Sequence, residues 1–249
     1  MSRLFITGDT HCDIDWNKLN TRRFPVQKEL TKNDHVLIAG DFGGIFDLNR
    51  TDDYIIKEYT RRRFTTLFID GNHENHDALD SYPVTIWNGG KVHMISDSVI
   101  HLMRGQVYEI DGKKIFTMGG AQSTDTEYRE EGKSWWRREL PSTEEYEEAL
   151  KNLAAHDFEV DYVVTHCAPE EYVYKTAGQF NRSSNALTVF LSDLIEKHRL
   201  RYKDWFWGHY HTDTDLGNMH CLYRRVLELT LTENGSVITE PPNGFTKGN

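Results

Sequence analysis

The sequence predicts a mixed α/β protein, α+β in part, with two β-sheets. In the first third of the chain, three apolar runs each end in a polar loop and are separated by polar or helical segments, which is typical of parallel strands in one sheet. Further along, two strand-like segments flank Asp111-Gly112, a pair typical of a hairpin turn. The first pattern predicts one sheet of parallel character, and the second predicts another sheet with more antiparallel pairing.

Length and composition favour one folded domain. The chain has 249 residues, of which 38% are hydrophobic and 27% charged, so a packed core is expected rather than disorder. We expect this single domain to cover residues 1–240, and the polar, glycine-containing residues 241–249 to form a flexible tail. The sequence has no stretch of roughly 18 apolar residues that would predict a membrane span.

Charge and cysteine content narrow the class of protein. The net charge of −10 argues against a general nucleic-acid binder, which normally has a basic surface. The three cysteines, Cys12, Cys167 and Cys221, are far apart and do not resemble a disulfide framework. They predict a reducing compartment, and we therefore expect a cytoplasmic protein.

The first half of the chain supplies the parallel strands. Their apolar runs cover residues 3–8, 36–39 and 65–69. Between the second and third runs, Asp52 and Asp53 are expected to cap a helix that extends to residue 63. Ile55, Ile56 and Tyr59 share one face of this helix and are expected to pack on the sheet.

The second half of the chain supplies the other sheet and two more helices. Ser142 and Glu145 have the spacing of a capping box and predict a helix start, and a second helix is expected over residues 185–198. Core strands are expected at residues 162–165 and 205–207. The second sheet is expected to begin near residue 99, to contain residues 102–110 and 114–118, and to close with residues 222–231.

A few types of polar residue follow the core strands. They are, in chain order, Asp9, His11, Asp41, Asn72, His73, His166, His209 and His211. One histidine in such a place is more often structural than a ligand, but this combination at five strand ends favours ligands. Carboxylate, amide and imidazole groups suit divalent ions, and their number exceeds the needs of one site. We expect two ions, preferably Mn²⁺, with Fe, Zn²⁺, Ni or Co as alternatives.

The same residues carry a family resemblance. The chain contains, in order, Asp9-x-His11, Gly40-Asp41, Gly71-Asn72-His73-Glu74, His166 and Gly208-His209-x-His211. Together these blocks resemble the motif set of the calcineurin-like metallophosphoesterase superfamily, in particular its small bacterial and phage-type members. The resemblance implies two mixed β-sheets packed as a β-sandwich flanked by helices.

The resemblance also implies a role for each residue. Asp9, His11 and His211 would serve one ion. Asn72, His166 and His209 would serve the other, and Asp41 would bridge both. His73 would face the scissile phosphate, and Glu74 would orient His73 or lie close to it.

The expected reaction is hydrolysis of a small phosphodiester or phosphomonoester. Two divalent ions lower the pKa of a shared water, so that hydroxide forms near neutral pH and attacks phosphorus in line. His73 is the nearest imidazole not used as a ligand, and we expect it to act as general acid on the leaving alkoxide.

Two segments refine the expected substrate. Phe42-Gly43-Gly44 follows Asp41, where Ser/Thr protein phosphatases of the superfamily carry Asp-Arg-Gly, which argues against protein phosphatase activity. Residues 121–141 resemble a recurring insert of the small members, and we expect a cap near the site. Arg129 in this segment and Arg182 beyond it are candidates for binding the substrate phosphate.

Two alternatives stay open at this level. A nuclease acting on DNA or RNA would use the same chemistry, although the acidic net charge disfavours it. A metal-binding scaffold without catalysis is disfavoured because every motif position is present. The expected partner is a small phosphoester, with nucleotides included, and neither a membrane nor a nucleic acid is expected. The sequence does not predict the oligomeric state.

Overall fold

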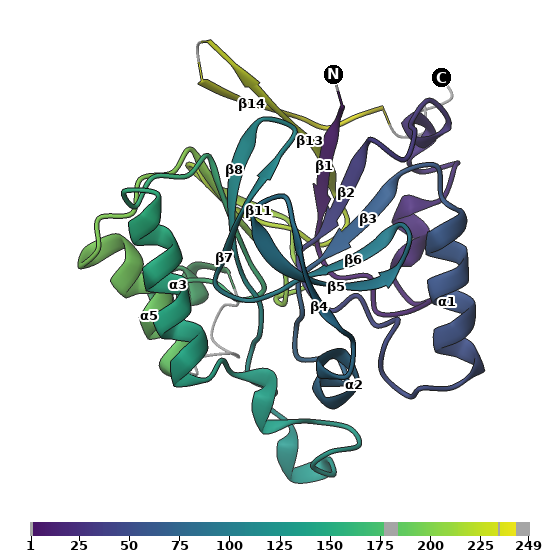
Figure 1. Cartoon of the computed structure of the whole chain (residues 1–249), viewed down its shortest axis with the longest axis horizontal. Helices are drawn as coiled ribbons and strands as arrows, with labels where there is room; N and C mark the ends of the chain where they lie inside the picture. The colour runs from purple at the N-terminus through teal and green to yellow at the C-terminus, as the bar shows by residue number, and fades with distance from the viewer. Residues whose placement is uncertain (1, 177–183, 234, 243–249) are drawn as a thin grey trace.

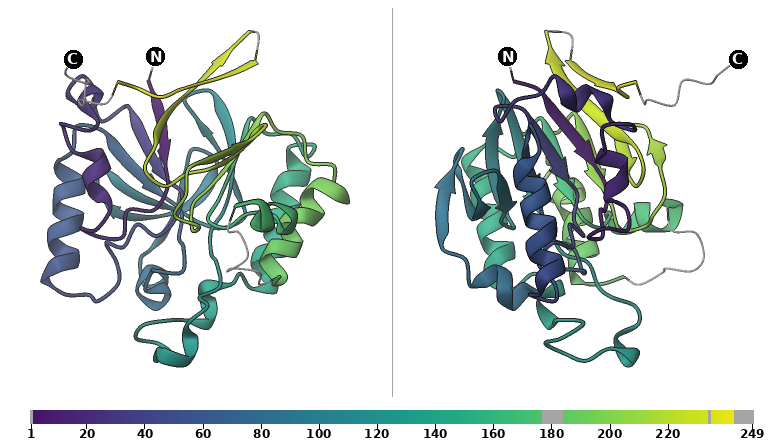
Figure 2. Two further views of the ribbon diagram at one scale, coloured as in Figure 1. Left: turned by 180° about the vertical axis from the view of Figure 1, so that it is seen from behind. Right: turned by 90° about the vertical axis from the view of Figure 1, so that its right-hand side faces the viewer.

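Two mixed β-sheets lie face to face in the centre of the protein, with helices on both outer sides (Figure 1). The computed structural model describes residues 2–176, 184–233 and 235–242. The layers are also visible from behind and from the side (Figure 2). The fold class predicted from the sequence is therefore confirmed. Most of the predicted tail, residues 243–249, lies outside the described residues.

The larger sheet combines a parallel centre with antiparallel edges. Its strands are β1 (Leu4–Thr7), β2 (His35–Ile38), β3 (Thr65–Phe68), β4 (Val84–Trp87), β5 (Gly90–Ser96), β6 (Val99–Leu102), β13 (Val226–Thr232) and β14 (Gly235–Thr239). Their order is β14-β13-β1-β2-β3-β6-β5-β4. The neighbours β1, β2, β3 and β6 pair in parallel, and the strands outside them pair antiparallel.

The smaller sheet is also mixed. Its strands are β7 (Gln106–Ile110), β8 (Lys113–Met118), β9 (Tyr162–Thr165), β10 (Asp204–Trp207), β11 (Thr214–Leu216) and β12 (Met219–Cys221). Their order is β11-β12-β10-β9-β8-β7, and the four central strands pair in parallel. The turn between β7 and β8 holds Asp111 and Gly112, both at positive φ, as a tight hairpin requires.

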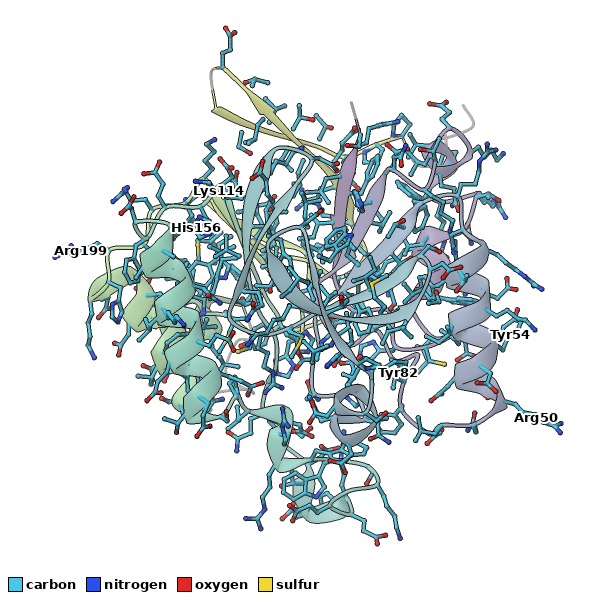
Figure 3. All side chains as sticks on the ribbon, viewed as in Figure 1. Arg50, Tyr54, Tyr82, Lys114, His156 and Arg199 are labelled. Atoms are coloured by element: carbon cyan, nitrogen blue, oxygen red, sulfur yellow. The ribbon has the colours of Figure 1, made fainter. Side chains whose placement is uncertain are left out.

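The helices cover the outer faces. They are α1 (Arg50–Arg61), α2 (His76–Asp80), α3 (Thr143–Ala155), α4 (Glu170–Thr176) and α5 (Ala186–Glu196). Helix α1 lies on the larger sheet, while α3 and α5 lie on the smaller one (Figure 2). Arg50 and Tyr54 point from α1 away from the sheets (Figure 3). The predicted capping box of α3 is confirmed, because Ser142 and Glu145 exchange the expected hydrogen bonds.

Alternation along the strands explains the layers. Leu4 and Ile6 of β1 point between the sheets, where they join Val164 of β9 in one apolar cluster. Phe5 points to the opposite face and packs in the cluster that includes Tyr59 of α1. Since successive strand residues face opposite sides, one strand supplies both the central core and the core under the helix.

Three sequence predictions are wrong in detail. Strand β6 and the predicted closing strand, now β13, belong to the larger sheet, where they pair with β3 and β1. Both sheets are mixed as predicted, but the second sheet does not have the larger share of antiparallel pairs that was expected, because its four central strands are parallel. Helix α1 is capped by Asn49, whose side chain accepts a hydrogen bond from Thr51, whereas Asp52 accepts from the backbone of the preceding loop.

A buried ion pair braces the loop after β3. Arg104 donates to Asp70 through Nε at 2.9 Å and Nη2 at 2.6 Å, and both residues are buried. Burial would raise the pKa of Asp70, but the charge of Arg104 outweighs it and holds that pKa well below its usual range.

We expect Arg104→Ala to lower the free energy of unfolding by about 3–5 kcal/mol, because it leaves the Asp70 carboxylate buried without its cation. Urea unfolding followed by circular dichroism measures the change. Arg201→Ala is the matched control, since it breaks an exposed pair with Glu159 and should cost less than about 1 kcal/mol. Equal losses in the two variants would contradict the prediction.

Within the described ranges, no helix combines the length and the apolar character needed to cross a membrane.

Candidate metal centre

The candidate ligands come together at one edge of the two sheets. They lie in the loops that follow β1, β2, β3, β9 and β10. Within each sheet these strands run parallel to one another, so the loops after them gather where their carboxyl ends meet. The apolar runs of the sequence therefore act as a rigid frame, and the polar residues after them form the site.

The backbone itself turns several of these side chains inward. His11, Asp41, His209 and His211 have φ angles of 41°, 49°, 67° and 50°. Residues other than glycine adopt this left-handed region rarely and at a cost in free energy. Four of the candidate ligands share this conformation, which indicates that the loops are shaped for the position of the side chains rather than for local stability.

Two glycines allow the loops to approach the carboxylates. A Cβ at Gly71 would collide with Asp41 Oδ1, and a Cβ at Gly208 would collide with Asp9 Oδ1. These glycines are required by the lack of space rather than by a turn. They explain why glycine directly precedes Asn72 and His209 in the sequence.

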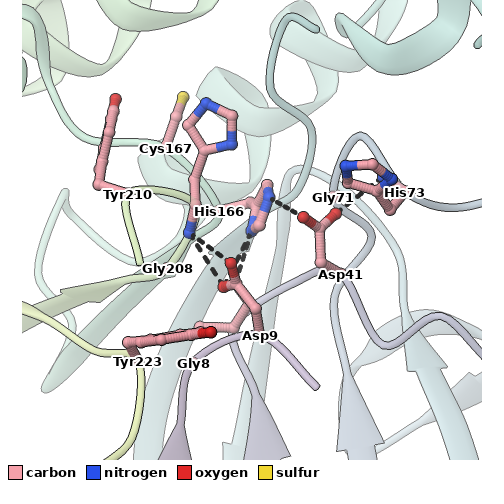
Figure 4. Close-up of polar contacts among 12 residues, drawn as sticks. Gly8, Asp9, Asp41, Gly71, His73, His166, Cys167, Gly208, Tyr210 and Tyr223 are labelled. Carbon is pink, nitrogen blue, oxygen red and sulfur yellow. Dashed lines mark hydrogen bonds and ion pairs between the residues drawn. The ribbon is translucent and has the colours of Figure 1, made fainter. Parts of the chain in front are cut away.

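Asp41 occupies the middle of the centre. Its Oδ2 lies 3.3 Å from His11 Nε2 and 3.3 Å from His166 Nε2, and its Oδ1 accepts a hydrogen bond of 2.8 Å from the His73 backbone. Figure 4 shows Asp41 between His73 and His166. One carboxylate thus faces ligand atoms on both sides, which is the position that a bridging ligand needs.

The first side of the centre contains Asp9, His11 and His211. One ligand atom from each of these residues lies within 4.8 Å of the other two. His211 Nε2 is 3.1 Å from Asp9 Oδ2, and Asp9 is fully buried. The geometry agrees with the grouping that the family resemblance implies for one ion.

The second side contains Asp41, His166 and His209, whose ligand atoms also lie within 4.8 Å of one another. Asn72 joins them, because its Oδ1 is 3.3 Å from His166 Nε2. The structure therefore brings together all seven residues that the sequence predicted as ligands.

Fixed hydrogen bonds select the ring nitrogen that faces the centre. His166 Nδ1 donates to the carbonyl of Ala39 at 2.8 Å, which leaves Nε2 toward Asp41. His11 Nδ1 lies 2.8 Å from Asp15 Oδ2, which likewise leaves Nε2 toward Asp41. A carboxylate or carbonyl partner on the far nitrogen is the usual support of a metal-binding histidine.

The charges of the centre fit a cation. Burial lowers the pKa of His166, but Asp41 and Asp9 outweigh it and raise that pKa to about 10. In the same way Asp41 and Asp9 raise the pKa of His11 to about 9 against the effect of burial. Buried carboxylates that hold protons on two histidines would hold divalent ions in their place. The donor set of oxygen and nitrogen without sulfur suits Mn²⁺, Fe, Zn²⁺ or similar ions.

His73 lies at the rim of this centre. Its ring is 5.4 Å from that of His11, and burial lowers its pKa, with a smaller opposing effect of Asp41. A ligand atom of His73 also comes within 4.8 Å of His11 and Asp41. Geometry alone therefore places His73 close enough for catalysis or for ligation.

Glu74 is buried behind the loop rather than beside the His73 ring. Its carboxylate accepts hydrogen bonds from the backbone of Gly43 at 3.0 Å and of Gly71 at 2.5 Å. Burial, and then the charge of Asp41, raises the pKa of Glu74 to about 8. These contacts tie two ligand-bearing loops together, whereas the described residues show no hydrogen bond between Glu74 and His73.

The 121–141 segment lies next to the centre. Asp125 and the carbonyl of Ser134 hold the Arg129 side chain, and the charge of Arg129 contributes to lowering the pKa of His73. Trp136 is buried and donates from Nε1 to Asp77, so it packs in the interior of the protein. Arg182 lies outside the described residues.

Two supporting residues were missed from the sequence. Asp15 contacts His11 Nδ1 and also accepts from the hydroxyl of Tyr223, whose ring stacks on His211 at 4.9 Å. Asp15 follows His11 by four residues, and this local spacing could have suggested the contact. Tyr223 has no local signal, because its place depends on the loop between β12 and β13.

Comparisons with known proteins identify the family of the chain. Among solved structures, the phosphopantetheinyl hydrolase PptH from Mycobacterium tuberculosis is similar to this chain with 14% identity and a TM-score of 0.43, over 99% of each chain. No curated protein matches the chain. The sequence model of the calcineurin-like phosphoesterase family matches residues 2–213, which include every candidate ligand. The chain therefore belongs to the calcineurin-like phosphoesterase family.

Proposed function

We propose that this protein is a phosphoesterase that uses two divalent metal ions, preferably Mn²⁺, to hydrolyse a small phosphodiester or phosphomonoester. The observation that carries this proposal is the position of Asp41, whose Oδ2 is 3.3 Å from a histidine nitrogen on each side. Asp9, His11 and His211 would hold one ion, and Asn72, His166 and His209 the other. Fe, Zn²⁺, Ni and Co are alternatives that the same ligands accept.

Two bound ions would supply an activated water and would neutralise charge on the phosphate oxygens. The residues of the chain supply the geometry. Asp41 sets the distance between the two sides, and the buried carboxylates keep the centre negative. His73 at the rim would give a proton to the leaving oxygen.

The surroundings of the centre support a small substrate. Asp125 and the carbonyl of Ser134 hold Arg129, and its charge acts on His73, which supports the proposal that Arg129 binds a phosphate oxygen. Arg182 is proposed as a second phosphate contact from the sequence alone. The net charge of −10 favours a small phosphoester, such as a nucleotide, over a polynucleotide, and we propose a cytoplasmic location.

We expect the purified protein to hydrolyse bis(p-nitrophenyl) phosphate or p-nitrophenyl phosphate in the presence of Mn²⁺. A chelator should abolish turnover, and added Mn²⁺ should restore it. The ratio of kcat/KM for the two substrates distinguishes a diesterase from a monoesterase.

Single- and double-stranded DNA and RNA, tested under the same conditions, decide the nuclease alternative. Metal analysis of the same sample decides the scaffold alternative. A protein that holds two ions but turns over no member of a broad phosphoester panel would contradict the proposed function.

A further inference from the structure

Two residues of the 121–141 segment connect to a candidate ligand. Asn72 donates from Nδ2 to Ser123 Oγ at 3.2 Å. Ser123 in turn meets Glu139, with Oγ 3.0 Å from Oε1 and the backbone nitrogen 2.8 Å from Oε2. All three residues are buried, with 4%, 5% and 3% of their surface exposed. The result is a short chain of hydrogen bonds from the segment to the second side of the centre.

The direction of each hydrogen bond follows from chemistry. A carboxylate can only accept, so Glu139 takes both the backbone proton and the hydroxyl proton of Ser123. The Ser123 hydroxyl has then given its one proton away and can only accept. It therefore selects the NH₂ end of the Asn72 amide, and the amide oxygen must point the other way.

The opposite end of the amide faces the centre. Asn72 Oδ1 is 3.3 Å from His166 Nε2, on the side that also contains Asp41 and His209. An amide binds a cation through oxygen and repels it through NH₂. An amide free to rotate would present the wrong group in part of its population and would weaken the ion on that side.

We propose that Ser123 and Glu139 are positioning residues that fix the Asn72 amide with its oxygen toward the ion held by Asn72, His166 and His209. This inference rests on the proposed function, because it assumes that the centre binds two ions. It gives the 121–141 segment a role in metal affinity on one side only, since the described contacts of Ser123 and Glu139 reach Asn72 and not the side of Asp9, His11 and His211.

The test compares ion affinities in single-sided variants. Metal-free protein is titrated with Mn²⁺ by calorimetry, in a His211→Ala background that retains the Asn72 side and in a His209→Ala background that retains the other side. We expect Ser123→Ala to weaken Mn²⁺ binding about 10- to 100-fold in the first background, the range found when a group that orients a ligand is removed. It should change affinity less than about twofold in the second.

Conservative variants separate positioning from folding. Ser123→Thr keeps the hydroxyl and should restore affinity, and Glu139→Gln should weaken binding in the same direction as Ser123→Ala. Ser134→Ala and Glu131→Gln are matched controls in the same segment that make no contact with Asn72 among the described residues, and they should bind as the parent does.

The outcomes are distinct. Equal affinities in the Ser123→Ala variant and its parent, or equal weakening on both sides, would overturn the positioning role. A wild-type protein that binds no Mn²⁺ would overturn the proposed function as well. A protein that binds two ions but hydrolyses nothing would refute only the function, since the affinities still decide the role of Ser123.

Discussion

Asp41→Asn is expected to remove at least one bound ion and to lower kcat by more than about 10³-fold. A single carboxylate oxygen of Asp41 lies 3.3 Å from the Nε2 atom of His11 on one side and 3.3 Å from that of His166 on the other. The substitution removes the negative charge that both ions would share. It therefore also removes the stabilisation that the two ions would give the transition state. Asparagine keeps an oxygen for the backbone N–H of His73, which alanine would leave without an acceptor.

Metal content by mass spectrometry and steady-state kinetics measure this effect in the same sample. Asp47→Asn is the control, because Asp47 is exposed in the following loop and its nearest described partner is Asn49. Circular dichroism and thermal unfolding show whether the variant is folded. A folded Asp41→Asn protein with two ions and more than a tenth of the parental kcat would exclude the bridging role.

His73→Gln should keep both ions but slow hydrolysis of substrates with poor leaving groups by about 10²–10⁴-fold. The reason is that an alkoxide leaving group needs a proton, whereas p-nitrophenolate leaves readily without one. The loss should therefore be much smaller for p-nitrophenyl phosphate than for an alkyl phosphate. Glutamine retains a polar side chain at the rim, so the change is mainly the loss of the proton.

Geometry allows His73 to act as a general acid or as a metal ligand. Metal content and the leaving-group comparison together distinguish these two roles. Loss of an ion in His73→Gln would make His73 a ligand, as its place beside His11 and Asp41 permits. An equal loss of rate for both substrates would contradict the general-acid role. His156→Gln is the matched control, because His156 directly follows α3 and belongs to none of the loops that carry candidate ligands (Figure 3).

The clustering of the candidate ligands was more predictable than the pairing of the strands around them. Asp9, Asp41 and His166 could be predicted to lie together because each stands shortly after an apolar run, and parallel strands carry such residues to one edge. The contacts of Ser123 and Tyr223 could not be predicted, because they depend on how a loop folds back on the strands. Local patterns indicate which residues lie at the site but not which residues hold them in place.

Strand partners were the least predictable part. Alternating residues predicted a closing strand at residues 222–231, now β13, and the second sheet was expected to begin near residue 99, where β6 lies. Neither pattern says which sheet a strand joins, and both strands joined the larger one. The hairpin of β4 and β5 was missed because several of its residues, such as Val84 and Ile86, are exposed apolar side chains at the sheet edge. Pairing is a long-range choice, made by the packing of the whole sheet.

The left-handed loop residues link metal supply to the survival of the fold. His11, Asp41, His209 and His211 each spend roughly 1–3 kcal/mol of conformational free energy to point inward. Ions that bind only the folded chain would add about 2.7 kcal/mol at a concentration one hundred times their dissociation constant. The lifetime of this protein in a cell would then depend on the availability of metal. As the concentration of the ion fell, the amount of folded protein would decrease before the activity of each folded molecule did.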